Sequence, residues 1–126
     1  MVELKTQRNE NRCAFTEHEH GISFSGSCPV SGNPQPGSRL TISYKGTEYF
    51  LEVAALKAFI ESYRGGRGGV RSMEGMLQEI TQACADILRV DVTLRSFLRI
   101  EPEQIMRVTC YAFPSITLSE IPGYDL

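Results

Sequence analysis

The sequence predicts an α+β domain in which one antiparallel sheet is covered on one face by two helices. Two segments, Arg39–Lys45 and Asp91–Ile100, alternate between apolar and polar residues, which is typical of half-buried strands. Between residues 73 and 88 the apolar residues instead recur at helical spacing. The expected order is strand, strand, helix, helix, strand, strand, so two hairpins flank a pair of helices.

The first hairpin is expected before residue 53. Gly21–Gly26 is predicted to be a short strand, and Arg39–Lys45 a longer one with alternate apolar side chains. Lys45-Gly46 is a plausible turn, after which Glu48–Glu52 is expected to return as the partner strand.

The N-terminal residues 1–19 are charged and polar, and we interpret them as a tail. Within them, Glu17-His18-Glu19-His20 places two histidines on one side of an extended segment. Such a pair could bind a metal weakly, but no third ligand is nearby in the sequence. A solvated tail is the favoured interpretation, and no metal site is predicted.

Two helices are expected in the middle of the chain. Val53–Tyr63 carries one apolar stripe, and the glycine-rich segment Arg64–Arg71 must end that helix. Ser72 can cap a second helix, in which Glu74 favours the positive end of the helix dipole. The stripe of this second helix is Met73, Met76, Leu77, Ile80, Cys84, Ile87 and Leu88.

The second hairpin is expected after these helices. Asp91–Ile100 is its first strand, Glu101-Pro102-Glu103 its turn, and Ile105–Phe113 its second strand. Residues 114–126 are expected to be an irregular tail because prolines interrupt them. We therefore predict a single domain over residues 1–126. One face of this hairpin is polar and carries Arg95, Phe97, Arg99, Arg107 and Tyr111.

Composition limits the class of protein. Of the 126 residues, 41% are hydrophobic and 22% charged, as in soluble globular proteins. No apolar run approaches the roughly 20 residues of a membrane span. The polar N-terminus has no signal-like segment, and the four scattered cysteines have no CxxC spacing, so we expect a cytoplasmic protein. A net charge of −2 argues against general nucleic-acid binding and leaves only local basic clusters for such contacts.

The segment Ser27–Gly37 holds a single cysteine, Cys28, in a stretch that can be neither helix nor regular strand. Its three prolines fix φ, and Gly32 and Gly37 permit the turns that this requires. A rigid loop suits a thiol that must be held still while it reacts, because the thiolate attacks carbon electrophiles such as nitriles. The alternative is a buried cysteine that packs as a small hydrophobic residue.

The residues Cys28-Pro29-Val30-Ser31-Gly32-Asn33-Pro34 resemble the active-site segment of the QueF family, nitrile oxidoreductases that act on 7-cyano-7-deazaguanine. In that family the cysteine adds to the nitrile to form a covalent thioimide. The family segment usually reads Cys-Pro-Val-Thr-Gly-Gln-Pro-Asp, so Gln35 stands in the place of the aspartate. The resemblance covers about residues 22–113 and implies the tunnelling fold, whose subunits assemble into rings.

A second motif departs further from the reductases. Their NADPH motif reads roughly Glu-Ser-Lys-Ser-Leu-Lys-Leu-Tyr, whereas residues 52–59 here keep Glu52, Leu56, Lys57 and an aromatic residue. The first lysine is Ala54, and the two serines are Val53 and Ala55. A phosphorylated dinucleotide needs positive charge and polar donors, so we expect no NADPH site and no cofactor.

The third motif concerns the base. Ser72-Met73-Glu74 resembles the Phe-His-Glu segment, whose glutamate binds the pyrimidine edge of the deazaguanine. A carboxylate that accepts from a ring N–H and an amine fits such an edge. Taken alone, Glu74 is better explained as a first-turn helix residue. The resemblance assigns substrate binding to Glu52, Glu74, Ser31 and Gln78.

The retained cysteine loop and the degraded NADPH motif resemble the QueF-like branch, the archaeal amidinotransferases. These enzymes act on tRNA that already carries the nitrile base and form the amidine of archaeosine from ammonia. The resemblance implies Cys28 and Gln35 as catalytic positions, an ammonia donor, and homo-oligomeric pentameric rings, single or stacked as a decamer. An amide is no general acid at neutral pH, so water, the substrate ammonium or Glu52 would have to replace the aspartate.

A tRNA substrate would give the basic residues a role. Arg64, Arg67 and Arg71 lie in a glycine-rich segment that could follow phosphates, although a solvated loop is the favoured interpretation for each of them taken singly. Two alternatives remain open: an NADPH-dependent 7-cyano-7-deazaguanine reductase with a variant cofactor site, and a base-binding or tRNA-binding ring without efficient catalysis. A zinc-dependent cyclohydrolase of the same fold is the least favoured interpretation.

Overall fold

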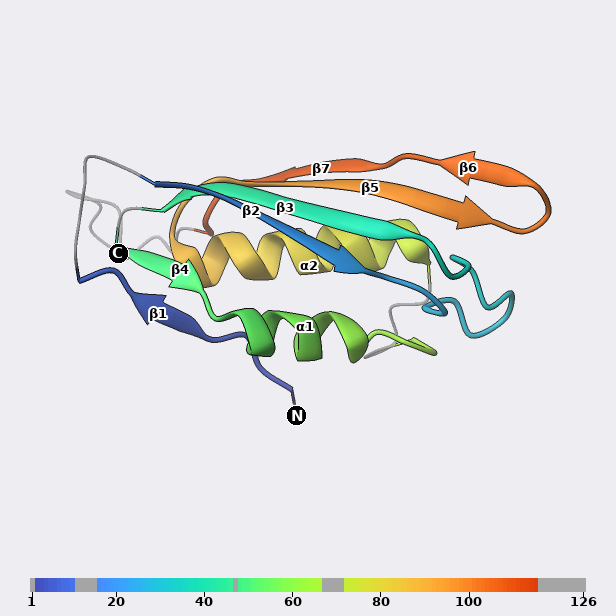
Figure 1. Cartoon of the computed structure of the whole chain (residues 1–126), viewed down its shortest axis with the longest axis horizontal. Helices are drawn as coiled ribbons and strands as arrows, with labels where there is room; N and C mark the ends of the chain where they lie inside the picture. The colour runs from blue at the N-terminus through green and yellow to red at the C-terminus, as the bar shows by residue number, and fades with distance from the viewer. Residues whose placement is uncertain (1, 11–15, 47, 67–71, 116–126) are drawn as a thin grey trace, which may run out of the picture.

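A mainly antiparallel sheet is the larger layer of the computed structural model (Figure 1). Its strands lie in the order β2 (Thr16–Ser23), β3 (Arg39–Gly46), β5 (Val92–Ile100) and β7 (Thr109–Ala112), and the short β6 (Gln104–Met106) extends the ladder beside the end of β5. The α+β prediction is confirmed. The structure describes residues 2–10, 16–46, 48–66 and 72–115.

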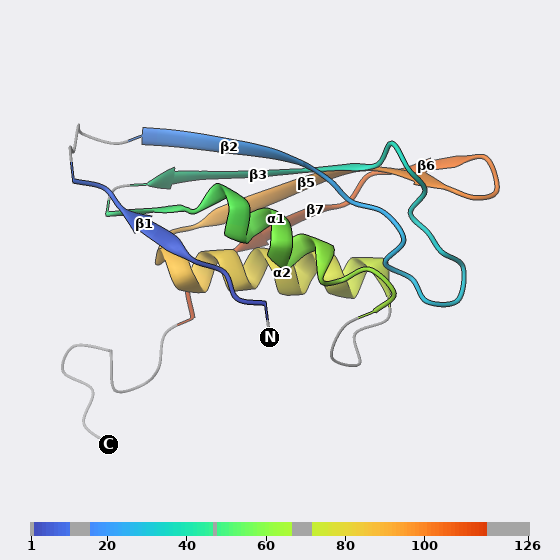
Figure 2. The same cartoon turned by 60° about the horizontal axis from the view of Figure 1, so that its bottom comes forward.

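Two helices, α1 (Val53–Glu61) and α2 (Met73–Leu88), cover one face of the sheet (Figures 1 and 2). The hydroxyl of Ser72 accepts a hydrogen bond from the N–H of Gly75 at 3.0 Å and caps α2, as the sequence predicted. The helix ends at Arg89, which has a left-handed φ of 59°. The opposite face of the sheet is covered by no described element.

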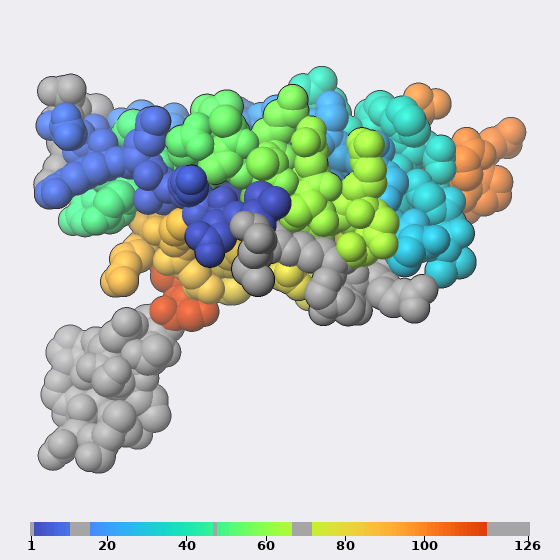
Figure 3. All heavy atoms as spheres, turned by 90° about the horizontal axis from the view of Figure 1, so that it is seen from below, coloured from blue at the N-terminus to red at the C-terminus, as the bar shows by residue number. Residues whose placement is uncertain are grey.

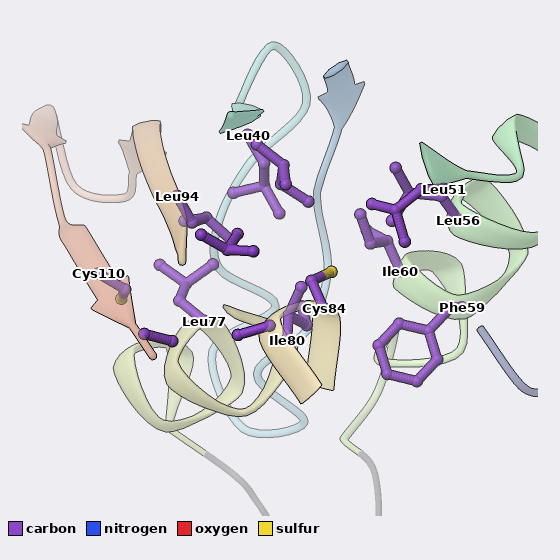
Figure 4. Packing of buried hydrophobic residues seen from close by; sticks show 14 of the residues in the cluster. Leu40, Leu51, Leu56, Phe59, Ile60, Leu77, Ile80, Cys84, Leu94 and Cys110 are labelled. Carbon is purple, nitrogen blue, oxygen red and sulfur yellow. The ribbon is translucent and has the colours of Figure 1, made fainter. Parts of the chain in front are cut away.

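The hydrophobic core lies between the sheet and the helices (Figure 4). Every second residue of β3 and β5 points toward the helices, which leaves the intervening residues on the open face. Burial of one such leucine or isoleucine stabilises the fold by about 1.5–3 kcal/mol. Side chains with at most 1% exposure come from the sheet and from both helices: Leu40, Ile42 and Leu94 of the sheet, Leu56 and Ile60 of α1, and Leu77, Ile80 and Cys84 of α2.

The interpretation of residues 1–19 as a tail is corrected by two strands, β1 (Thr6–Arg8) and β2. His18 stacks on Tyr44 with ring centroids 4.9 Å apart, and Nε2 of His20 lies 3.0 Å from the Tyr44 hydroxyl. The two histidines therefore face the helix layer, while the glutamates beside them are exposed. The alternation of glutamate and histidine has the two-residue period of a strand, but because all four residues are polar it gives no hydrophobic signal of one.

The predicted pairing of Glu48–Glu52 with Arg39–Lys45 is wrong. The strand β4 (Tyr49–Leu51) pairs with β1 in a separate two-stranded sheet, because both edges of β3 are occupied by β2 and β5. The N–H of Leu51 donates to the Tyr44 hydroxyl at 2.8 Å and holds β4 beneath the sheet. On this side the N-terminal segment lies against the helices (Figure 3).

The predicted strand Ile105–Phe113 is interrupted. Between β6 and β7, the Ser96 hydroxyl donates to the carbonyl of Val108 and accepts from its N–H, both at 2.9 Å. The chain then leaves β7 along α2, where Asp86 accepts from the N–H of Ser115 at 2.8 Å. The predicted tail is described only to Ser115, and residues 116–126 lie outside the described residues. In the described parts of the chain, no helix has the length and hydropathy to cross a membrane.

Candidate functional site

The connection between β2 and β3, residues 24–38, contains Cys28, and we call it the cysteine loop. It lies at the same end of the sheet as the turn between β5 and β6 (Figure 1). The N–H of Cys28 donates to the carbonyl of Asn33, and the N–H of Gly32 donates back to the carbonyl of Cys28, both at 2.9 Å. Gly32 has a φ of +73°, which glycine adopts without strain. These two bonds close a tight turn that begins at Cys28.

The side chain of Asn33 joins this turn to the second hairpin. Its Oδ1 accepts from the N–H of Glu101 at 3.0 Å, and its Nδ2 donates to the carbonyl of Glu101 at 3.2 Å. The same Oδ1 accepts from Nε2 of Gln35 at 3.0 Å. Since Asn33 is only 7% exposed, these bonds are largely shielded from water. They fix the cysteine loop against β5 and its turn.

Ser38 makes a second connection of the same kind. Its buried hydroxyl donates to the carbonyl of Gln35 at 2.7 Å and accepts from the N–H of Arg99 at 2.8 Å. The N–H of Gln35 in turn donates to the carbonyl of Arg99 at 2.7 Å. Sequence reasoning missed the roles of both Asn33 and Ser38, because the partners that tie them to the second hairpin, Glu101 and Arg99, lie far along the chain.

The three described cysteines are all free thiols, and they differ in environment. Burial raises the pKa of Cys84 to about 12, so it stays protonated at neutral pH. Burial also raises the pKa of Cys110, although a hydrogen bond with Thr81 acts in the opposite direction. Cys28 is only partly buried, whereas the other two are buried. Of these three, Cys28 is the cysteine that the sequence predicted to be the nucleophile, and it is the least buried.

Gln35 and Ser31, two further predicted site residues, share the cysteine loop with Cys28. The amide of Gln35 is engaged with Asn33, as described above. The exposed hydroxyl of Ser31 accepts from the N–H of Asn33 at 3.2 Å. Both side chains therefore support the turn at Cys28.

Glu52 lies elsewhere. Its carboxylate caps α1, with Oε1 accepting from the N–H of Ala54 at 3.0 Å and Oε2 from that of Ala55 at 2.9 Å. Helix α1 is about 13 Å long, and its far end is the one that approaches the cysteine loop, through a bond from the N–H of Gly65 to the carbonyl of Gly26 at 2.8 Å. Within one chain, Glu52 and Cys28 are not brought together.

Glu74 and Gln78 lie on α2. Glu74 is exposed in the first turn, and Gln78, one turn later, lines a groove of about 370 Å³ beside β7. The other walls of this groove come from Thr81 of α2 and from residues of β7 such as Tyr111. Of these two predicted substrate residues, Gln78 therefore faces the β7 edge of the sheet.

Of the three predicted tRNA-binding arginines, the structure describes one. Arg64 is exposed, and its side chain passes within 3.5 Å of the position that a Cβ on Gly26 would occupy. It thus lies against the cysteine loop. Arg67 and Arg71 lie outside the described residues.

A second groove, of about 430 Å³, separates the β2 edge from α1 and was not foreseen from the sequence. His20, Ile22, Val53, Lys57 and Glu61 are among the residues that line it. Burial lowers the pKa of His20, and the nearby His18 acts in the same direction. Over the described parts of the chain, no three His, Cys, Asp or Glu residues are grouped so as to hold a metal ion.

Comparison of the chain with protein-family models and with curated proteins yields no match in either case.

Proposed function

We propose that this protein is an amidinotransferase of the QueF-like type. It converts the nitrile of 7-cyano-7-deazaguanine in tRNA into the amidine of archaeosine. The observation that carries the proposal is the partly exposed residue Cys28 in a loop whose shape is fixed by Asn33 and Ser38. A nucleophile held in one geometry reacts without first paying the entropy of ordering its loop.

The proposed reaction has two covalent steps. The Cys28 thiolate adds to the nitrile carbon, a C–S bond forms, and the nitrile nitrogen takes a proton to give a thioimide. Ammonia then attacks the same carbon, the C–S bond breaks, and the thiolate leaves. The sum is addition of one ammonia to one nitrile, so the protein needs neither an oxidant nor a reductant.

The proton for the first step is proposed to come from ammonium or water. Gln35 carries an amide, which cannot act as a general acid at neutral pH, and its Nε2 is bonded to Asn33. Glu52 is the other acid that the sequence suggested, but both of its oxygens accept hydrogen bonds at the start of α1.

Absence of a nicotinamide cofactor is part of the proposal. The surface of α1 that matches the reductase NADPH motif carries Val53, which is 70% exposed, followed by Ala54 and Ala55. Such a surface offers no hydroxyl at these positions and no cation at position 54. A phosphate would find few partners there.

A ring of subunits, pentameric and either single or stacked as a decamer, would complete the site. The sheet has two edges without a described neighbour, β2 and β7, and each is flanked by one of the two grooves. Pairing of a β2 edge with the β7 edge of another subunit would bring these grooves together. Gln78 from one chain would then lie near residues of α1 from the next. The tunnelling fold and a cytoplasmic location belong to the same proposal.

The test uses tRNA that bears 7-cyano-7-deazaguanine, incubated with either an ammonium salt or NADPH, followed by digestion and mass analysis of the nucleosides. An amidine that forms with ammonium alone is the expected product, and Cys28→Ala should reduce it at least 1,000-fold, on the order of the loss seen when a nucleophile is removed. Cys84→Ala serves as the matched control, because this cysteine is fully buried in the hydrophobic core and lines neither groove.

Other outcomes would replace the proposal. An aminomethyl product that requires NADPH would identify a reductase. Unchanged nitrile under both conditions, together with tight tRNA binding, would identify a binding protein, and Gln35 would then be the first residue to replace by aspartate.

A further inference from the structure

The open face of the sheet carries a concentrated positive charge at the end where the cysteine loop lies. Four arginines, Arg39, Arg95, Arg99 and Arg107, are exposed there, and we call them the arginine face. No acidic residue occupies a strand position at this end; the nearest ones along the chain, Glu101 and Glu103, lie in the turn beyond β5. Because the whole chain has a net charge of −2, this clustering is local.

An aromatic side chain lies at the centre of the arginine face. Phe97 is directly opposite Arg39 in the pairing of β5 with β3, and Arg95 and Arg99 flank it on the same strand. The guanidinium carbon of Arg107 lies 5.3 Å from the centre of the Phe97 ring. This contact is a cation–π interaction, and it leaves the ring only half-buried.

The arginines of this face form no ion pair with any described carboxylate. Over the described parts of the chain, none of the four is within ion-pair distance of a carboxylate, whereas Lys45 at the other end of the sheet pairs with Glu17 at 3.8 Å. Exposed arginines are common on protein surfaces, so the exposure of these side chains alone would not indicate a binding site. The four guanidinium groups therefore keep their positive charge uncompensated by a carboxylate of the described residues, which leaves it available to an anionic ligand.

The arginine face is joined to the cysteine loop. Arg39 is the first residue after this loop, and Nη1 of Arg99 donates to the carbonyl of Pro36 at 3.4 Å. The Arg99 side chain also covers Gly37, since a Cβ there would lie 3.0 Å from the Arg99 Cδ. A ligand on this face would therefore run directly past the loop that holds Cys28.

We infer that the arginine face binds a single-stranded segment of RNA, with guanidinium groups on successive phosphates and one base stacked on Phe97. Charge complementarity identifies the occupant as a polyanion, and the aromatic ring among the cations favours exposed bases over a duplex. The inference rests on the proposed function for the choice of RNA. It extends that function by assigning the nucleotides beside the reactive base to this surface, because a base must leave its stack before the thiol can reach it.

The test is fluorescence anisotropy with a labelled, unmodified twelve-nucleotide RNA over a range of KCl concentrations. We expect Arg39→Gln/Arg95→Gln to bind more weakly and to lower the slope of log affinity against log salt by about 1.4, or about 0.7 for each lost phosphate contact. Phe97→Ala should weaken binding about 5- to 150-fold with little change in that slope. The matched control, Lys5→Gln/Arg8→Gln, removes two exposed charges from the N-terminal segment and should bind as the unmodified protein does.

Circular dichroism shows whether each variant is folded, and reaction of Cys28 with the free nitrile base is measured on the same samples. Loss of RNA binding with an intact Cys28 adduct supports the inference. Absence of salt-dependent binding by the unmodified protein, equal loss in the control, or tighter binding of a duplex of the same length would overturn it. Failure of the proposed function is recognised separately, as absence of the Cys28 adduct.

Discussion

Each of the two hairpins pairs consecutive strands in antiparallel orientation, but the connections between their strands differ greatly in length. In the second hairpin, β5 passes to β6 through only Glu101–Glu103. In the first, β2 passes to β3 through the whole cysteine loop, residues 24–38. Closure of the longer connection costs about 1–2 kcal/mol more in chain entropy. The comparison teaches that the loop which carries the candidate nucleophile is held by the short turn of its neighbour, through Asn33 and Ser38.

Removal of the Asn33 side chain should have the largest effect on this arrangement. Asn33→Ala deletes three hydrogen bonds, and at about 1 kcal/mol each we expect the free energy of unfolding to fall by about 2–3 kcal/mol. Urea denaturation followed by circular dichroism measures this change. Gln82→Ala is the matched control, because that amide also makes three bonds but on the outer side of α2, where water can replace them. Equal losses in the two variants would show that the Asn33 bonds have no special importance.

Two serines allow the hairpins to be compared directly. The hydroxyls of Ser38 and Ser96 each join one backbone N–H to one backbone carbonyl, at 2.7–2.9 Å. Replacement of either by alanine should lower the free energy of unfolding by about 1–2 kcal/mol. Only Ser38→Ala should also change the rate at which Cys28 reacts with iodoacetamide, because only Ser38 supports the cysteine loop. A rate change of the same size in Ser96→Ala would contradict the assigned role of Ser38.

The smallest expected effect concerns pH. Both histidines of the chain belong to β2, in the first hairpin. Because the pKa of His20 is lowered in the folded state, chiefly by burial, the unfolded chain binds a proton first as the pH falls. Stability is therefore complete above about pH 6.5 and decreases below it, at less than the one-proton limit of about 1.4 kcal/mol per pH unit.

His20→Phe keeps an aromatic ring in the stack with Tyr44 but cannot titrate. Thermal unfolding between pH 5 and 7 should give a shallower pH dependence for this variant than for the unmodified protein. An unchanged slope would assign the acid sensitivity to other groups.

The elements with a clear hydrophobic period were predictable from the sequence. Both helices and the strands β3 and β5 follow the expected patterns closely, since burial of one face dictates which residues are apolar. Pairing was harder to predict. β4 pairs with β1, and β2 was concealed in a polar segment, because polar side chains such as His18 and His20 stack on aromatic rings instead of filling an aliphatic core.

The candidate site divides in the same way. The sequence identified Cys28 and its loop, because prolines and glycines mark a special backbone locally. It could not identify Asn33 as the residue that holds the loop, because its partner, Glu101, is far along the chain. Asn33 bonds only to the backbone of Glu101, so the residue type at position 101 gives no signal of the contact. The separation in space between Glu52 and Cys28 could not be predicted either, because it depends on which end of α1 lies near the cysteine loop.

The Asn33 bonds have a consequence for how this loop would evolve. Asn33 stabilises the fold whether or not the thiol reacts, so selection for stability alone would preserve it, together with the buried Pro34 beside it. A descendant that lost the chemistry would be free to replace Cys28 yet would retain the residues around it. In related chains, the identity of the residue at position 28 would therefore distinguish active from inactive lineages better than similarity over the rest of the motif.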